Sequence, residues 1–155
     1  MLRFIALLLV ISGVAHAQNW REIRGGHRGE VHTVAVTPAG VVLHGTFSSG
    51  VLRSTDGGAT WEPGRMGNGE SIDAVVSLPV SSIVVDERPG EILVTSSKNI
   101  YRSTDDGATW TVHYTGISDG NRVLTIAAIA RLGNDATLIG TASGFWRSGA
   151  RDCRR

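Results

Sequence analysis

Residues 54–61 read Ser-Thr-Asp-Gly-Gly-Ala-Thr-Trp, and residues 103–110 read Ser-Thr-Asp-Asp-Gly-Ala-Thr-Trp. The two octapeptides differ at one position, and the second begins 49 residues after the first. A repeat of this period indicates an array of structural units, because each unit buries its apolar face only by stacking on a neighbour. The fold prediction therefore starts from these two segments.

Three units of the sequence align when they are superposed on the arginine that precedes the motif. These arginines are Arg53, Arg102 and Arg147. Each unit reads as strand, turn, strand, short loop and strand. The strand after each motif Trp adds a fourth, and four antiparallel strands per 45 to 49 residues are typical of a propeller blade. The sequence thus predicts an all-β fold, a partial β-propeller of about three four-stranded antiparallel blades. The expected blades are residues 25–65, 74–114 and 122–148 within a repeat region of 18–148.

The motif Ser-x-Asp-x-Gly-x-Thr-Trp resembles the Asp-box, also called the bacterial neuraminidase repeat. That motif occurs once per blade in β-propellers of sialidases, other glycosidases, sortilin-type receptors and photosystem assembly factors. The resemblance implies Asp-box hairpins between the third and fourth strands of each blade. It implies no particular chemistry, because one fold carries many functions.

Each motif contains four residues to which we assign a structural role. The Asp carboxylate accepts hydrogen bonds from backbone N–H groups of the turn, the Gly supplies a positive φ, and the Trp covers the turn. A calcium loop is the alternative for residues 105–107, but the segment lacks the further oxygen ligands that an EF-hand type loop needs. No metal or other cofactor is expected. The assigned residues are Ser54, Asp56, Gly58, Trp61, Ser103, Asp105, Gly107 and Trp110.

The first 17 residues predict a signal peptide. Arg3 precedes an apolar run, and the small residues Ala15 and Ala17 flank His16, as in a peptidase cleavage site. A membrane anchor would need about 20 apolar residues, and this run stops near Val14. We expect cleavage after Ala17 and a secreted or periplasmic bacterial protein with no membrane span after cleavage.

Two segments depart from the regular pattern. Residues 20–23 align with the strand that follows each motif Trp, so a fourth strand precedes the first complete unit. In closed propellers, such a terminal strand commonly completes the last blade. Residues 149–155 are an off-pattern basic tail, which we interpret as a frameshift, an early stop or a degenerate final blade. We expect the open blade faces to support self-association or to need a partner.

The composition limits the classes of partner. Lys and Arg number 15 against 14 Asp and Glu, so the sequence has no nucleic-acid footprint. Cys153 is the only cysteine, which excludes an intrachain disulfide. The expected ligand is an unknown protein or glycan.

No catalytic residue can be carried over from the sialidases. Their Arg-Ile-Pro signature is missing, because residues 21–24 read Arg-Glu-Ile-Arg, and neither Tyr101 nor Tyr114 lies in a nucleophile context. We expect a non-catalytic binding or scaffolding module, with a fragment of an Asp-box glycoside hydrolase as the alternative. The carboxylates available for a glycosidase pair are interpreted as solvated turn residues; these are Asp73, Asp86, Glu87 and Asp119.

The histidines and the repeated arginines receive structural interpretations. The spacing of His27, His32, His44 and His113 matches no zinc site. Each repeated arginine is expected to lay its aliphatic stem on the motif Trp with its head in water. The alternative is a ring of arginines that binds an anion.

Overall fold

The computed structural model describes residues 22–23, 30–67, 79–97, 99–115, 117–118, 120, 123–132 and 136–148. The predicted signal peptide, the basic tail, His27, Asp73 and Asp119 lie outside these ranges. Within them, no helix combines the length and apolarity needed to cross a bilayer.

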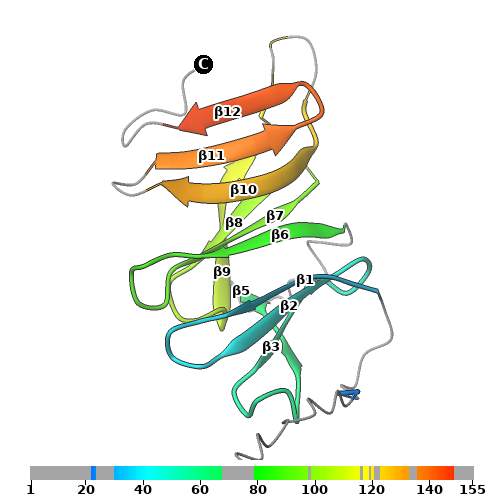
Figure 1. The fold of residues 1–155 in the computed structure, drawn as a ribbon, viewed down its shortest axis with the longest axis vertical. Helices are drawn as coiled ribbons and strands as arrows, with labels where there is room; N and C mark the ends of the chain where they lie inside the picture. The colour runs from blue at the N-terminus through cyan, green and yellow to red at the C-terminus, as the bar shows by residue number, and fades with distance from the viewer. Residues whose placement is uncertain are drawn as a thin grey trace, which may run out of the picture.

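The described strands form three sheets, each of which corresponds to one predicted unit (Figure 1). The first blade contains β1 (Val31–Val36), β2 (Val42–Thr46), β3 (Val51–Ser54) and β4 (Glu62–Pro63). The second contains β6 (Val80–Val85), β7 (Ile92–Ser96), β8 (Asn99–Ser103) and β9 (Thr109–Thr115). The third contains β10 (Ile126–Leu132), β11 (Ala136–Thr141) and β12 (Gly144–Ser148). The predicted all-β fold of antiparallel blades is confirmed.

The strand after Trp61 does not remain within its own blade. Its first part, β4, pairs antiparallel with β3, whereas β5 (Arg65–Met66) pairs in parallel with β9 of the second blade. Between them, Gly64 lies so close to Trp110 that an added Cβ would be 2.5 Å from the indole Nε1. The chain therefore crosses to the next blade where a side chain would not fit. The sequence predicted an antiparallel fourth strand and missed this parallel crossing.

Apolar side chains fill both spaces between the blades. Side chains alternate along each strand, so every blade presents one face to the blade before it and one to the blade after it. The first interblade cluster consists of Val41, Leu43, Val51, Val80, Ile83, Ile92, Val94, Tyr101 and Trp110. The second interblade cluster consists of Leu93, Ile100, Ile117, Leu124, Ile126, Ile129 and Ile139. The stacking that the repeat predicted thus provides the core.

The strand registers identify equivalent positions in the three blades. Leu43 pairs with Arg53, Leu93 with Arg102, and Leu138 with Arg147. Counting along the strands from these pairs identifies three further sets of residues, and the members of each set occupy the same position in the three blades. These sets are Val41, Glu91 and Ala136; Val36, Val85 and Arg131; and Gly45, Thr95 and Gly140.

Candidate functional site

The two Asp-box turns have the same hydrogen bonds. Ser103 Oγ donates to Asp105 Oδ1 at 2.8 Å and accepts from Gly107 N at 2.9 Å. Asp105 Oδ1 also accepts from Thr109 N at 2.8 Å, and Asp105 Oδ2 accepts from Thr109 Oγ1 at 2.6 Å. Trp110 Nε1 donates to the Gly107 carbonyl at 3.0 Å, and Gly107 has a φ of 81°. Both carboxylate oxygens of Asp105 are therefore engaged within the turn.

In the first box, Asp56 makes the equivalent contacts with Ser54 and Thr60 at 2.6 to 2.8 Å. The hydrogen bonds from the Thr60 side chain and backbone, with that from Ser54, lower the pKa of Asp56 to about 2. Burial opposes ionisation of Asp105, but its hydrogen bonds from Thr109 and Ser103 outweigh burial and lower its pKa as well. Both carboxylates are thus held ionised by their own turns.

The two box tryptophans differ in what covers them. Trp110 is fully buried, because Leu43 and Gly64 of the first blade lie against its turn. Trp61 is half-buried and stacks on His44, with ring centroids 4.1 Å apart. Ile23 lies against the turn of the first box, 3.3 Å from where a Cβ on Gly58 would be. Ile23 therefore covers that box only in part.

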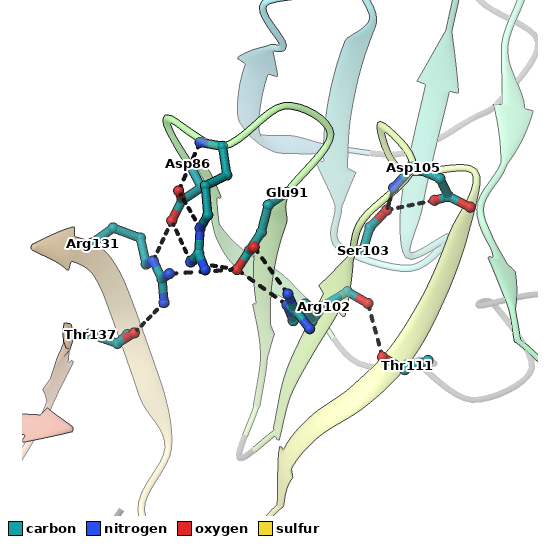
Figure 2. A network of polar contacts seen from close by, with 9 residues as sticks. Asp86, Glu91, Arg102, Ser103, Asp105, Thr111, Arg131 and Thr137 are labelled. Atoms are coloured by element: carbon teal, nitrogen blue, oxygen red, sulfur yellow. Dashed lines mark hydrogen bonds and ion pairs between the residues drawn. The ribbon is translucent and has the colours of Figure 1, made fainter. Parts of the chain in front are cut away.

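An ion-pair cluster joins the second blade to the third, and it is the most strongly charged feature of the described chain (Figure 2). Glu91 accepts from Arg102 through Nε at 3.2 Å and Nη2 at 3.0 Å, and from Arg88 Nη2 at 2.8 Å. Arg131 Nε donates to Asp86 Oδ2 at 2.6 Å, and Arg131 Nη1 donates to Thr137 Oγ1 at 3.1 Å. We call Asp86, Arg88, Glu91, Arg102 and Arg131 the arginine cluster.

Two of the three arginines in the arginine cluster are much more exposed than its carboxylates, whereas the Arg131 side chain is 13% exposed. The Arg88 and Arg102 side chains are 45% and 37% exposed, whereas those of Asp86 and Glu91 are 10% and 7% exposed. The carboxylates thus lie beneath the guanidinium groups that hold them. Among the described residues, the cluster presents positive charge to solvent.

The pKa values follow from this geometry. Burial opposes ionisation of Glu91, but hydrogen bonds from Arg102 and Arg88 outweigh it, so the pKa of Glu91 is lowered. Asp86 behaves in the same way, with burial opposed by hydrogen bonds from the backbone and side chain of Arg88. The neighbouring His113 has its pKa lowered by burial and by the charge of Arg102. Glu91 and Asp86 are therefore anions, and His113 is neutral, at neutral pH.

Two predictions made from the sequence are corrected by this arrangement. The prediction of a solvated turn carboxylate is wrong for Asp86, which is mostly buried in the arginine cluster, whereas Glu87 is exposed. The prediction that the arginine heads lie in water is wrong for Arg53, whose side chain is 17% exposed and pairs with Glu62, whereas Arg102 is 37% exposed and also pairs with Glu91. Arg53 Nη1 pairs with Glu62 at 2.6 Å, and its Nε donates to the Asp106 carbonyl of the next blade at 3.1 Å.

The remaining candidates are dispersed. Tyr101 is buried in the first interblade cluster, where its hydroxyl accepts from Asn99 Nδ2 at 3.2 Å. His32, on the first strand of the first blade, packs edge-on against Phe47. No group of three metal-ligating side chains occurs in the part of the chain that the structure describes.

Sequence reasoning missed the arginine cluster. A signal was present, because Glu91, just before β7, and Arg131, on β10, occupy the positions that Val41 and Val85 have at the first interface. A charge in an otherwise apolar strand position is informative when a partner of opposite sign faces it. The pairing becomes visible only once the two strands are placed side by side.

Comparison with known families supports the repeat assignment. Residues 52–63 match the model of the BNR/Asp-box repeat. No curated protein is significantly similar to the chain.

Solved propeller structures resemble the chain in fold. YCF48 bound to a D1 peptide has a TM-score of 0.59 and 18% identity, over 81% of this chain and 39% of YCF48. An ancestral GH74 enzyme has a TM-score of 0.54 and 22% identity, over 79% of this chain and 15% of the enzyme. The extracellular domain of a putative one-component system from B. thetaiotaomicron has a TM-score of 0.55 and 16% identity, over 76% of this chain and 14% of the other chain. The chain therefore spans less than half of each of these proteins.

The chain carries Asp-box repeats that fold as blades of the β-propeller type, as the sequence predicted. The structural relatives include both a peptide-bound protein and glycoside hydrolases, so the fold is compatible with either kind of function.

Proposed function

We propose that this chain is an exported, non-catalytic binding module that recognises an acidic segment of a protein partner through the arginine cluster. The observation that carries the proposal is the difference in exposure within that cluster. Arg88 and Arg102 face solvent while Glu91, which orients them, is buried. Guanidinium groups held in fixed positions favour bidentate binding of carboxylates.

The same contacts support a binding role over a hydrolytic one. A glycosidase pair needs one carboxyl group that donates a proton and one that acts as base or nucleophile. The pKa values of Asp56, Asp86, Glu91 and Asp105 are all lowered, which disfavours the protonated acid that such a reaction needs. The box residues are accordingly assigned to turn structure, and Tyr101 to the core.

Export is inferred from the first 17 residues, with the mature chain starting at Gln18. Intact-mass measurement of secreted or periplasmic material checks this part of the proposal. A soluble extracytoplasmic product that retains Met1 would contradict it.

Fluorescence anisotropy with labelled peptides tests ligand recognition. A deca-glutamate peptide should bind, while a deca-lysine peptide and a Gly-Ser peptide of equal length should not. Binding should weaken with added salt, because exposed charges are screened. Arg102→Ala and Arg88→Ala should each reduce the affinity about tenfold, which corresponds to about 1.4 kcal/mol.

The matched control is Arg65→Ala, because Arg65 is an exposed arginine on β5 outside the cluster. This variant should bind the acidic peptide with the affinity of the unaltered chain. The thermal unfolding midpoint is measured for every variant, so that weaker binding caused by loss of folding is recognised. Equal binding of all three peptides would contradict the proposal. Hydrolysis of a fluorogenic sialoside or of xyloglucan by the purified chain would favour the glycoside hydrolase alternative instead.

A further inference from the structure

We propose that the acidic segment bound by this chain carries an aromatic side chain among its carboxylates, and that the aromatic ring stacks on the flat face of the Arg102 guanidinium group. Because this contact belongs to the same site, it rests on the proposed function and adds a second chemical feature to the ligand. Glu91 holds one edge of Arg102, and this pairing decides what the guanidinium group offers to a ligand.

Glu91 occupies the Nε and Nη2 edge of the Arg102 guanidinium group. Arg102 Nε donates to Glu91 Oε1 at 3.2 Å, and Arg102 Nη2 donates to Glu91 Oε2 at 3.0 Å. Two parallel bonds of this kind are the geometry in which arginine binds a carboxylate most strongly. The Glu91 side chain is 7% exposed, so a ligand carboxylate would have to displace a mostly buried group to use the same edge. A ligand therefore uses another part of Arg102.

The rest of the Arg102 side chain is accessible to a ligand. The side chain is 37% exposed, although its bonded edge lies against a mostly buried carboxylate. The exposed area therefore belongs to the aliphatic stem, to Nη1 and to the flat faces of the guanidinium group. These faces have no hydrogen-bond donors, but a guanidinium plane stacks on aromatic rings and is attracted by their π electrons.

The net charge of the arginine cluster is small. Its three guanidinium groups face two carboxylates, which leaves one net positive charge. Exposed ion pairs contribute little free energy, and dissolved salt screens them. A stacked ring adds apolar contact and cation–π attraction at the same place. An acidic segment with an aromatic residue thus fits the cluster better than an acidic segment alone.

Arg102 presents its faces from a rigid element. It lies on β8 between β7 and β9, and its register partners are Leu93 and Thr111. Figure 2 shows Arg102 beside Glu91, with Thr111 on the neighbouring strand. Thr111 and His113 on β9 are exposed, so the surface next to Arg102 is open to an incoming ring. A group that is already held in place loses little conformational entropy when a ligand binds.

Arg88 is the alternative platform for the ring. Its Nε and Nη2 donate to Asp86, and Nη2 also donates to Glu91, while the side chain is 45% exposed. Arg88 lies in the turn between β6 and β7, whereas strands on both sides hold Arg102. The stacked contact is therefore assigned to Arg102, and variants of both arginines are compared.

Fluorescence anisotropy with three labelled peptides tests for the ring. The first peptide is deca-glutamate, the second has phenylalanine in place of one central glutamate, and the third has cyclohexylalanine at that place. Cyclohexylalanine has the same carbon skeleton as phenylalanine but no π electrons. The phenylalanine peptide should bind about two- to fivefold more tightly than the cyclohexylalanine peptide, as expected for an exposed cation–π contact.

Substitution by glutamine identifies the arginine that carries the ring. Arg102→Gln should weaken the binding of all three peptides and should abolish the preference for phenylalanine over cyclohexylalanine. Arg88→Gln makes the same change of charge in the same cluster, so it should weaken binding but keep the preference. Arg65→Gln is the control outside the cluster and should change neither quantity, because Arg65 is exposed on β5. The thermal unfolding midpoint of each variant shows whether it is folded.

The outcomes distinguish the stacked contact from the proposed function on which it rests. Binding of deca-glutamate with equal affinities for the other two peptides would overturn the stacked contact and leave the proposed function intact. Loss of the preference in Arg88→Gln but not in Arg102→Gln would overturn the assignment to Arg102. If none of the three peptides binds the unaltered chain, the proposed function is wrong, and the stacked contact is wrong with it.

Discussion

Arg131 Nε lies 2.6 Å from Asp86 Oδ2, so an ion pair joins the first strand of the third blade to the turn of the second. Arg131 Nη2 also lies 3.5 Å from Glu91 Oε1. At the interface between the first and second blades, Val41 takes the position of Glu91 and Val85 takes the position of Arg131. Both valines contribute to an apolar cluster. One structural position thus joins neighbouring blades by two different chemistries.

Replacing Glu91 by Val should lower the free energy of unfolding by about 3 kcal/mol, because it leaves the mostly buried Arg131 without one of its carboxylates. Arg131→Val should have a similar effect. The double variant should lose clearly less than the sum of the two single losses, because removing either partner leaves the other buried without it, although Asp86 then keeps only Arg88. Urea unfolding of the four proteins gives the coupling energy. Strictly additive losses would contradict the prediction, and Glu87→Val at an exposed site is the control.

Trp110→Ala should lower the free energy of unfolding more than Trp61→Ala does. Trp110 is fully buried between two blades, so its truncation should lower the free energy of unfolding by about 3 to 5 kcal/mol. Trp61 is half-buried and should cost clearly less. Asp105→Ala should cost about 1 to 3 kcal/mol through the turn donors that it leaves without an acceptor. Chemical denaturation measures all three, and equal losses for the two tryptophans would contradict the asymmetry.

Gly64→Ala should destabilise the chain by about 1 to 3 kcal/mol, because the new methyl group would overlap the Trp110 indole. Gly67→Ala is the matched control, since its nearest contacts would be at 3.7 and 3.8 Å. Thermal unfolding followed by tryptophan fluorescence compares the two variants. A Gly64→Ala midpoint equal to that of Gly67→Ala would show that the crossing tolerates a side chain.

The free energy of unfolding should fall as the pH drops below the ordinary carboxylate pKa values, and the carboxylates should not change it above them. The pKa values of Asp56, Asp86, Glu91 and Asp105 are lower in the folded chain than their ordinary values of 3.8 to 4.5. Their stabilisation is therefore present above those ordinary values and is lost as the pH falls toward the folded values, about 2 for Asp56. Urea midpoints between pH 6 and pH 2 check this. A midpoint unchanged from about pH 5 to pH 2.5 would contradict it.

The fold was predictable because its signals are local and repeated. Alternating apolar residues at 31–36 and the turn before β2 predicted β1 with the bounds that the structure has. The Asp-box identified the hairpin through residues that interact within one turn. Such contacts lie within a few positions in the sequence, so the pattern records them directly.

The candidate site was not predictable in the same way. The contact between Asp86 and Arg131 spans 45 residues, and nothing near either residue marks the other as its partner. The parallel pairing of β5 with β9 depends on how two blades are placed, not on either strand alone. Only the geometry of stacked blades brings these residues together.

The β5 crossing has a consequence for the order in which the chain can fold. The segment Arg65–Met66 is synthesised well before its partner Thr109–Thr115. During synthesis this segment cannot pair until the second unit has emerged, so the first blade cannot complete its contact with β9 alone. The first two units should therefore mature as one cooperative step, and a nascent chain stalled between them should remain sensitive to proteases.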